Sequence, residues 1–323
     1  MCIHNIMRHP ATPATFQSAF TLIEISIVLV IIGLIVGGIL TGQNLINAAS
    51  IRAQIAQIEK YNTAVRTFQG KYGYLPGDIP DPFATSFGFQ QRGTYAGEGD
   101  GNGLLEGNCA NTNGGNTGIR NGCGELAVFW EDLSKPGLID TVIYGHDTNG
   151  TSYPYTSGPN GLPGTNVLFT TTPSIYQWLP LAKLGQNNFI YTYSMAGMNY
   201  FAISSVTIIE WDIESSVNPG ITVQQASMID SKMDDGLPQS GSVFAGYVNK
   251  IVSAGNCIYA AGNNLQGANG GFNSTLMLCN PTTTATSYLS TNCYDNTGTA
   301  GVQKYSLQQN ANIANCALSF RFQ

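Results

Sequence analysis

Two acidic stretches of the sequence carry side chains of the kinds that bind metal ions. The first is Glu98-Gly-Asp100-Gly-Asn102-Gly, with Glu106 close behind, and the second is Asp230 with Asp234-Asp235-Gly236. Oxygen ligands at alternate positions, with glycines that allow a tight turn, suit a hard cation such as Ca²⁺, although the spacing does not match an EF-hand. The candidate calcium ligands are Asp100, Asn102, Asp234 and Asp235. The alternative for both stretches is a turn or helix end in which these side chains hydrogen-bond to the backbone.

Patterns for catalysis are scarce. His146 is the only histidine after residue 19, and no candidate nucleophile lies beside it. Neither G-x-S-x-G nor H-E-x-x-H occurs. A pair of carboxylates for glycoside hydrolysis leaves no local pattern, so a hydrolase stays open as an alternative. We expect that the chain is not an enzyme.

The charge of the chain argues against nucleic acid as a partner. The 323 residues include 19 acidic and 13 basic ones, which gives a net charge of −6. Binding to phosphates requires a basic face. The 38 glycines, together with many Asn, Ser and Thr, predict a polar surface with many turns.

Six cysteines follow the first segment of the chain, in which Cys2 lies. An even number of cysteines in an exported chain predicts disulfides, and six of them allow 15 pairings. No C-x-x-C occurs, so a zinc ribbon or a redox motif has no support. By proximity we expect one bridge between Cys109 and Cys123 and two bridges among Cys257, Cys279, Cys293 and Cys316.

The elements that must position these residues begin with an apolar segment. Residues 20–40 read FTLIEISIVLVIIGLIVGGIL, and about 20 such residues span a bilayer as a helix. A secretory signal peptide has a shorter apolar region of roughly 7–15 residues, and it ends in an A-x-A site that is missing here. A signal-anchor is the remaining simple alternative.

The helical pattern continues beyond the apolar segment. Apolar residues recur at steps of three and four from Ile51 to Phe68, which indicates one buried helix face. Gly70 and Gly73 favour a helix end there, and Pro76 prevents the helix from continuing. The sequence therefore predicts a helix over residues 20–70, with a transmembrane part at 20–42 and an amphipathic part at 43–70.

The run Ala19-Phe20-Thr21-Leu22-Ile23-Glu24 resembles the prepilin processing motif of type IV pilins, competence pilins and type II secretion pseudopilins. The resemblance implies cleavage between Ala19 and Phe20 by a membrane aspartyl peptidase, the prepilin peptidase, and N-methylation of Phe20. Ala19 stands where the family usually has Gly. Residues 1–19 would be a leader that is removed, with residues 71–323 as a globular head.

Glu24 needs a partner if it enters hydrocarbon, because a charged side chain at the centre of a bilayer costs roughly 2.5 kcal/mol or more. The resemblance implies that this partner is the positive N-terminus of a neighbouring subunit, which would set the register of a filament. The alternative is a glutamate at the membrane edge that reaches water.

The remainder of the chain predicts a head of the α+β class, with an antiparallel sheet and long disulfide-bearing loops. Leu75-Pro76-Gly77-Asp78 and the stretch 229–236 resemble parts of pseudopilin heads, and some pseudopilins bind calcium near their C-terminal region. We expect a loop at 88–124, helices at 125–133 and 222–233, and a capping box formed by Thr222 and Gln225. Expected strands are 166–171, 188–195, 199–209, 242–248, 256–261, 275–278 and 317–322, with Ala196-Gly197-Met198 as a hairpin turn.

These patterns lead to one functional expectation and one alternative. The chain is expected to be a structural subunit, a minor pilin or a pseudopilin, of a type IV pilus or a type II secretion pseudopilus. Its partners would be other pilin subunits, the prepilin peptidase and the bacterial inner membrane, with the head in the periplasm before assembly. The alternative is a membrane-tethered exported binding protein or hydrolase whose N-terminal helix is only an anchor.

Overall fold

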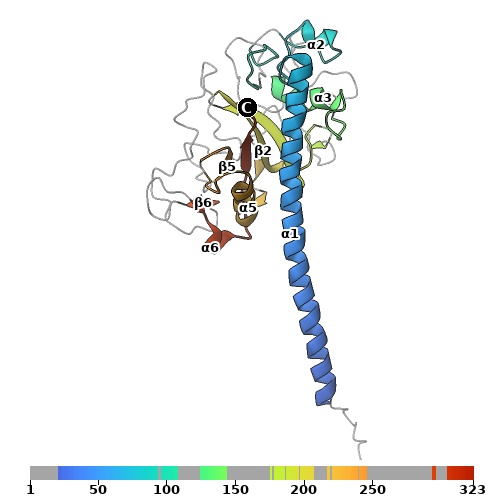
Figure 1. The fold of residues 1–323 in the computed structure, drawn as a ribbon, viewed down its shortest axis with the longest axis vertical. Helices are drawn as coiled ribbons and strands as arrows, with labels where there is room; N and C mark the ends of the chain where they lie inside the picture. Colours follow the sequence, from blue (N-terminus) through green and yellow to red (C-terminus); the bar gives the residue numbers. More distant parts are fainter. Residues whose placement is uncertain are drawn as a thin grey trace, which may run out of the picture. The chain divides into compact units, whose positions relative to one another are not determined.

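The computed structural model describes residues 21–93, 96–107, 124–143, 175–176, 178–185, 187–195, 197–206, 217–218, 220–238, 240–245, 293–295 and 304–323. Packing divides the chain into two compact units, residues 1–48 and 49–323. The division falls inside the first helix, α1 (Leu22–Tyr72), which is drawn in blue in Figure 1.

Helix α1 confirms the predicted long helix, and it ends two residues later than expected. It has 51 residues, and from Ile51 to Phe68 it buries one face at steps of three and four. The helix stops at Gly73, which has φ 81° and donates its backbone N–H to the carbonyl of Gln69 at 2.8 Å. A left-handed glycine directly after the last turn is a common helix end.

The second unit contains an antiparallel sheet in the order β1-β2-β9-β5. These strands are β1 (Asn188–Met195), β2 (Met198–Val206), β9 (Leu318–Arg321) and β5 (Val243–Ala245), and β3 (Val217–Asn218) pairs with β2. Two small antiparallel pairs join β4 (Ile221–Thr222) to β8 (Ala314–Cys316) and β6 (Tyr294–Asp295) to β7 (Lys304–Tyr305). A long helix with an antiparallel sheet is the predicted α+β class.

The turn between β1 and β2 is one residue shorter than predicted. Met198 pairs with Met195 and therefore belongs to β2. Gly197 has φ 76°, a conformation that glycine adopts at little cost.

Four further helices of the second unit are described. They are α2 (Phe83–Ser86), α3 (Gly124–Ser134), α5 (Val223–Met233) and α6 (Leu307–Asn310). Helix α3 confirms the expected helix at 125–133, and its residues from Gly124 to Leu133 are all buried. Helix α5 confirms the expected capping box, because Thr222 and Gln225 each bond the other's backbone N–H.

The core of the second unit forms where α1, α3 and the sheet meet. Tyr61 of α1 lies 4.9 Å from the ring of Trp130 in α3, and Trp130 stacks on Phe201 of β2 at 5.8 Å. Figure 1 shows α3 and β2 beside this half of α1. The amphipathic half of α1 is therefore part of the head.

Several sequence predictions fall partly or wholly outside the described residues. Strand β1 matches its expected range, β5 and β9 lie within theirs, and β2 begins one residue before its expected start at 199. The described parts 88–93 and 96–107 of the expected loop contain no helix or strand, whereas its last residue, Gly124, begins α3. The strands expected at 166–171, 256–261 and 275–278 are outside the described residues, as are the ends of two other strands at 207–209 and 246–248.

Candidate functional site

The first half of α1, residues 22–48, has an uncovered apolar surface, and we call it the stem. Each of its fourteen large apolar side chains from Leu22 to Leu40 is 49–87% exposed within the chain. Burying one such side chain is worth about 1.5–3 kcal/mol, so leaving all of them in water costs roughly 20 kcal/mol or more. A cost of that size exceeds the stability of a typical domain. The stem therefore requires a membrane or other protein chains around it.

The polar groups in the apolar part of the stem are satisfied by the helix itself. The hydroxyl of Ser26 donates to the carbonyl of Ile23 at 2.8 Å, and that of Thr41 donates to the carbonyl of Gly37 at 3.0 Å. In lipid, polar groups need partners within the protein. Helix α1 is long and apolar enough to cross a membrane, a property that membrane anchors and signal sequences share.

Glu24 is the only charged residue of the stem, and it lies in the first turn of α1. Its carboxylate oxygen Oε2 accepts the backbone N–H and the hydroxyl of Thr21, both at 2.8 Å. The Thr21 hydroxyl oxygen in turn accepts the backbone N–H of Glu24 at 3.3 Å. This reciprocal pair is a capping box. It holds the Glu24 carboxylate at the start of the helix.

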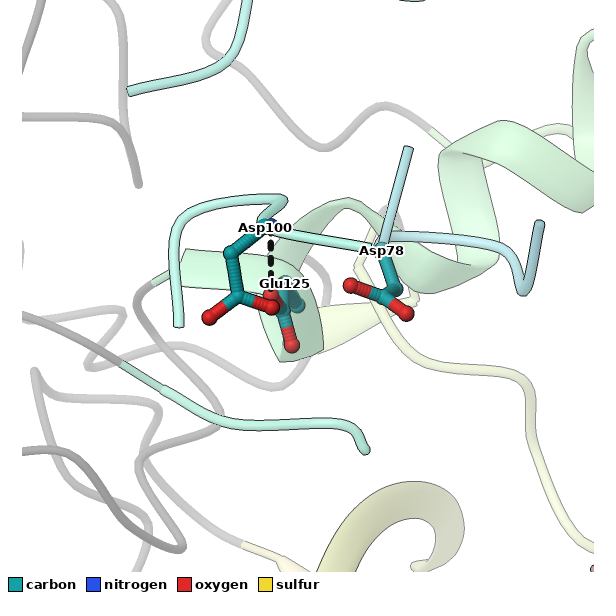
Figure 2. A group of neighbouring side chains, drawn as sticks. All are labelled: Asp78, Asp100 and Glu125. Atoms are coloured by element: carbon teal, nitrogen blue, oxygen red, sulfur yellow. Dashed lines mark hydrogen bonds between the residues drawn. The ribbon is translucent and has the colours of Figure 1, made fainter. Parts of the chain in front are cut away.

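A second candidate site joins three carboxyl groups from three parts of the chain. Asp78 follows α1, Asp100 lies in the glycine-rich stretch 96–106, which we call the acidic loop, and Glu125 lies in the first turn of α3. Each residue offers an oxygen within 4.8 Å of the other two. Figure 2 shows the three groups close together, with the backbone N–H of Asp100 bonded to Glu125.

The acidic loop turns its backbone N–H groups toward the two buried carboxylates. Gly101 and Gly103 have φ 75° and 85°, a conformation that glycine adopts at little cost. Their N–H groups donate to the two oxygens of Asp78 at 2.6 and 2.7 Å. Glu125 accepts N–H groups from Gly99 and Glu106, both at 2.9 Å.

The negative charge of this cluster is only partly compensated. Burial, opposed by the N–H bonds, raises the pKa of Asp78 to about 6, and the charge of Asp100 adds to this increase. Burial also raises the pKa of Glu125 well above its usual value, and the charge of Asp78 contributes. A proton or a bound cation would relieve the repulsion. Carboxylate oxygens at this spacing suit a hard cation such as Ca²⁺.

One asparagine that the sequence patterns missed anchors the acidic loop. Asn199 of β2 is buried, accepts the N–H of Leu105 at 2.9 Å and donates to the carbonyl of Gly103 at 2.8 Å. Its amide also donates to the side chain of Gln323 at 3.0 Å. A lone asparagine in a strand carries no sequence signal for this role.

The predicted ligands Asp100 and Asn102 do lie together, but Asn102 supports the turn. Its backbone N–H and its side-chain amide donate to the carboxylate of Asp100 at 3.0 and 3.2 Å. Its side-chain oxygen Oδ1 accepts the N–H of Leu104 at 2.7 Å. The candidate cation ligands that the structure adds are Asp78 and Glu125, which the sequence analysis did not select.

The predicted ligands Asp234 and Asp235 form a second group with Asp230 at the end of α5. Asp234 accepts N–H groups from Ser242 and Val243, and Asp235 accepts the N–H of Leu237 and the hydroxyl of Ser240. These bonds fit the expected alternative, a helix end and turn held by side-chain hydrogen bonds.

Asp230 is the buried member of this group. It accepts the hydroxyl of Tyr305 at 2.7 Å and the N–H of Gly236 at 3.1 Å. Burial raises the pKa of Asp230 to about 6. The Tyr305 bond ties α5 to the β6–β7 pair.

One disulfide is present among the described residues, between Cys293 and Cys316. It is a bridge within the set of four cysteines for which two bridges were expected. The other predicted disulfide residues, Cys109, Cys123, Cys257 and Cys279, lie outside the described residues, as do Ala19 and Phe20.

No family model, no curated protein and no solved structure matches this chain.

Proposed function

We propose that this chain is a structural subunit, a minor pilin or pseudopilin, of a type IV pilus or a type II secretion pseudopilus. The observation that carries the proposal is the stem, which is apolar on all sides and has one acid near its start. In the proposed cycle a membrane covers the stem first, and neighbouring stems cover it after assembly. The resemblance of residues 19–24 to the prepilin motif supports the same function.

Glu24 is the proposed contact between subunits. Cleavage after Ala19 would create a methylated, positively charged amine on Phe20. Both hydrogen bonds that Thr21 donates to Glu24 reach Oε2, and a carboxylate has about four acceptor positions. Oε1 is therefore available for the amine of a neighbouring Phe20, and one axial offset between subunits would satisfy both charges.

The proposed location before assembly is the bacterial inner membrane, with a single pass and the head in the periplasm. The Cys293–Cys316 disulfide supports a head outside the cytoplasm, because disulfides persist in oxidising compartments. The proposed partners are other pilin or pseudopilin subunits and the prepilin peptidase.

Mass spectrometry of the protein isolated from cells with and without prepilin peptidase tests the processing step. We expect a chain that starts at methylated Phe20 only where the peptidase is active. A chain that still starts at Met1 in both strains contradicts the proposal. That result would favour the alternative, a membrane-tethered exported binding protein or hydrolase, which hydrolase assays of the purified protein would then examine.

The variant Glu24→Ala tests the assembly step. We expect a normal amount of subunit in the membrane and a tenfold or greater loss of sheared polymer, because no carboxylate remains for the neighbour's amine. Ser26→Ala is the matched control, since the Ser26 hydroxyl only bonds its own helix. If Glu24→Ala and Ser26→Ala gave the same yield of sheared polymer, the proposed contact between Glu24 and the neighbouring amine would be wrong.

A further inference from the structure

Asn102 and Gly103 form an Asn-Gly pair in the acidic loop, and Asn102 is exposed. An asparagine before glycine can react with its own backbone, because glycine has no side chain to obstruct the approach. In that reaction the backbone nitrogen of Gly103 loses its proton and bonds to Cγ of Asn102. The Cγ–Nδ2 bond breaks, and ammonia leaves with that proton. Water then opens the succinimide ring to aspartate or isoaspartate.

The side chain of Asn102 is held at both ends. Its oxygen Oδ1 accepts the backbone N–H of Leu104 at 2.7 Å. Its amide nitrogen Nδ2 donates to Asp100 at 3.2 Å and, in a long bond of 3.5 Å, to Glu106. The backbone N–H of Asn102 also donates to Asp100, at 3.0 Å. Loss of Nδ2 as ammonia therefore breaks hydrogen bonds to two carboxyl groups.

The nitrogen of Gly103, which would have to attack, has its proton bound to a buried carboxyl group. It donates to Oδ2 of Asp78 at 2.7 Å, and Asp78 is 1% exposed. A carboxylate is far too weak a base to remove an amide proton, so this bond keeps the proton on the nitrogen. The carbonyl oxygen of Gly103 is fixed as well, because it accepts the amide of Asn199 at 2.8 Å. The backbone of the reactive residue is therefore held on both sides.

The charges around the pair oppose the same reaction. Removal of the Gly103 proton leaves a negative charge on the nitrogen, and the attack moves this charge to Oδ1 of Asn102. The N–H of Leu104 would stabilise charge on Oδ1, whereas the carboxyl groups of Asp78 and Asp100 contact the pair directly. A nearby like charge disfavours the formation of a further negative charge.

We propose that Asn102 is a deamidation site that the acidic loop holds in its amide form, and that it reacts once the loop opens. The product changes the loop irreversibly. Aspartate at position 102 adds a carboxylate beside Asp100, and isoaspartate lengthens the main chain by one methylene group. The N–H groups of Gly101 and Gly103, which bond to Asp78, would then no longer fit its two oxygens. The modification thus marks each molecule whose loop has been open.

Incubation of the full-length protein in detergent at neutral pH, followed by peptide mapping that separates asparagine, aspartate and isoaspartate forms, tests the proposal. We expect Asn102 of folded wild type to deamidate at least about tenfold more slowly than in the same protein unfolded in urea, because the reaction requires local opening of the loop. Asp100→Ala removes the bonds to Asn102 and should raise the rate in the folded protein about three- to tenfold. Asp100→Ser, which retains one acceptor oxygen, should give a rate between the two.

Asp140→Ala is the matched control, because it removes an exposed carboxylate that pairs with Lys60, and it should leave the rate at Asn102 unchanged. The Asn160-Gly161 pair is an internal reference whose rate should be the same in every folded variant. Tryptophan fluorescence reports whether each variant is folded, and Asp100→Ser decides the matter if Asp100→Ala does not fold. Equal rates at Asn102 in folded and unfolded wild type would overturn the proposal. An unchanged or lower rate in the folded Asp100 variants would also overturn it, because this carboxylate would then not protect the amide.

Discussion

The variant Asp78→Asn tests how the negative charge of Asp78 in the buried carboxyl cluster affects the stability of the fold. Asp78 is 1% exposed, and its two oxygens accept the N–H groups of Gly101 and Gly103 at 2.6 and 2.7 Å. Burial nevertheless raises its pKa to about 6. Asparagine has nearly the same shape, has no charge at any pH and retains one acceptor oxygen. The substitution therefore separates the charge of Asp78 from its volume.

The sign of the pH dependence follows from the raised pKa. Between about pH 4 and pH 6 the folded chain holds a proton on Asp78 that the unfolded chain has released, so the free energy of unfolding falls as the pH rises through this range. A shift of about two pKa units corresponds to about 3 kcal/mol. Loss of one N–H acceptor costs Asp78→Asn about 1–3 kcal/mol at every pH. The free energy of unfolding of the variant, minus that of wild type, should therefore rise by about 3 kcal/mol between pH 4 and pH 7, because only wild type loses stability in this range.

Urea unfolding of the full-length chain in detergent with a chelator present, followed by tryptophan fluorescence, measures this difference, because Trp130 and Trp178 are both buried in the folded chain. Asp140→Asn is the control, because it removes an exposed carboxylate whose surface ion pair with Lys60 contributes at most about 1 kcal/mol to the free energy of unfolding. Millimolar calcium should raise the unfolding midpoint of wild type at pH 7, and it should raise that of Asp78→Asn much less, if an ion compensates the cluster. A difference between Asp78→Asn and wild type that does not change with pH would refute the reasoning.

Three other substitutions, each examined by thermal unfolding, remove contacts that stabilise the head. Asn199→Ala should lower the free energy of unfolding by about 2–4 kcal/mol, because three side-chain hydrogen bonds disappear. Faster hydrogen exchange in the acidic loop should accompany this loss. Asp132→Ala should cost about 3–5 kcal/mol, because it leaves Arg92 buried without the carboxylate of its ion pair; a surface-like loss below about 1 kcal/mol would contradict this. Cys316→Ser should cost about 3 kcal/mol for a bridge across 23 positions, and reduction of the wild-type disulfide should reproduce that loss.

The sequence by itself determined the elements whose signals are local. The apolar run and the steps of three and four predicted α1 because one helix turn relates residues three and four apart. Thr222 and Gln225 predicted the start of α5 for the same reason, since a capping box joins residues three apart. Glu24 stood out because a charge within an apolar run is rare.

Only the tertiary structure decided which acids meet. The sequence analysis selected Asp100 with its neighbour Asn102, whereas the structure places Asp100 beside Asp78 and Glu125, which lie before and after it in the chain. Asn199 reaches Leu105 across 94 positions. Hydrogen bonds and charges act over a few ångströms in space, and the packing of α1, α3 and β2 brings these distant residues within that range. A pattern along the chain contains no record of that packing.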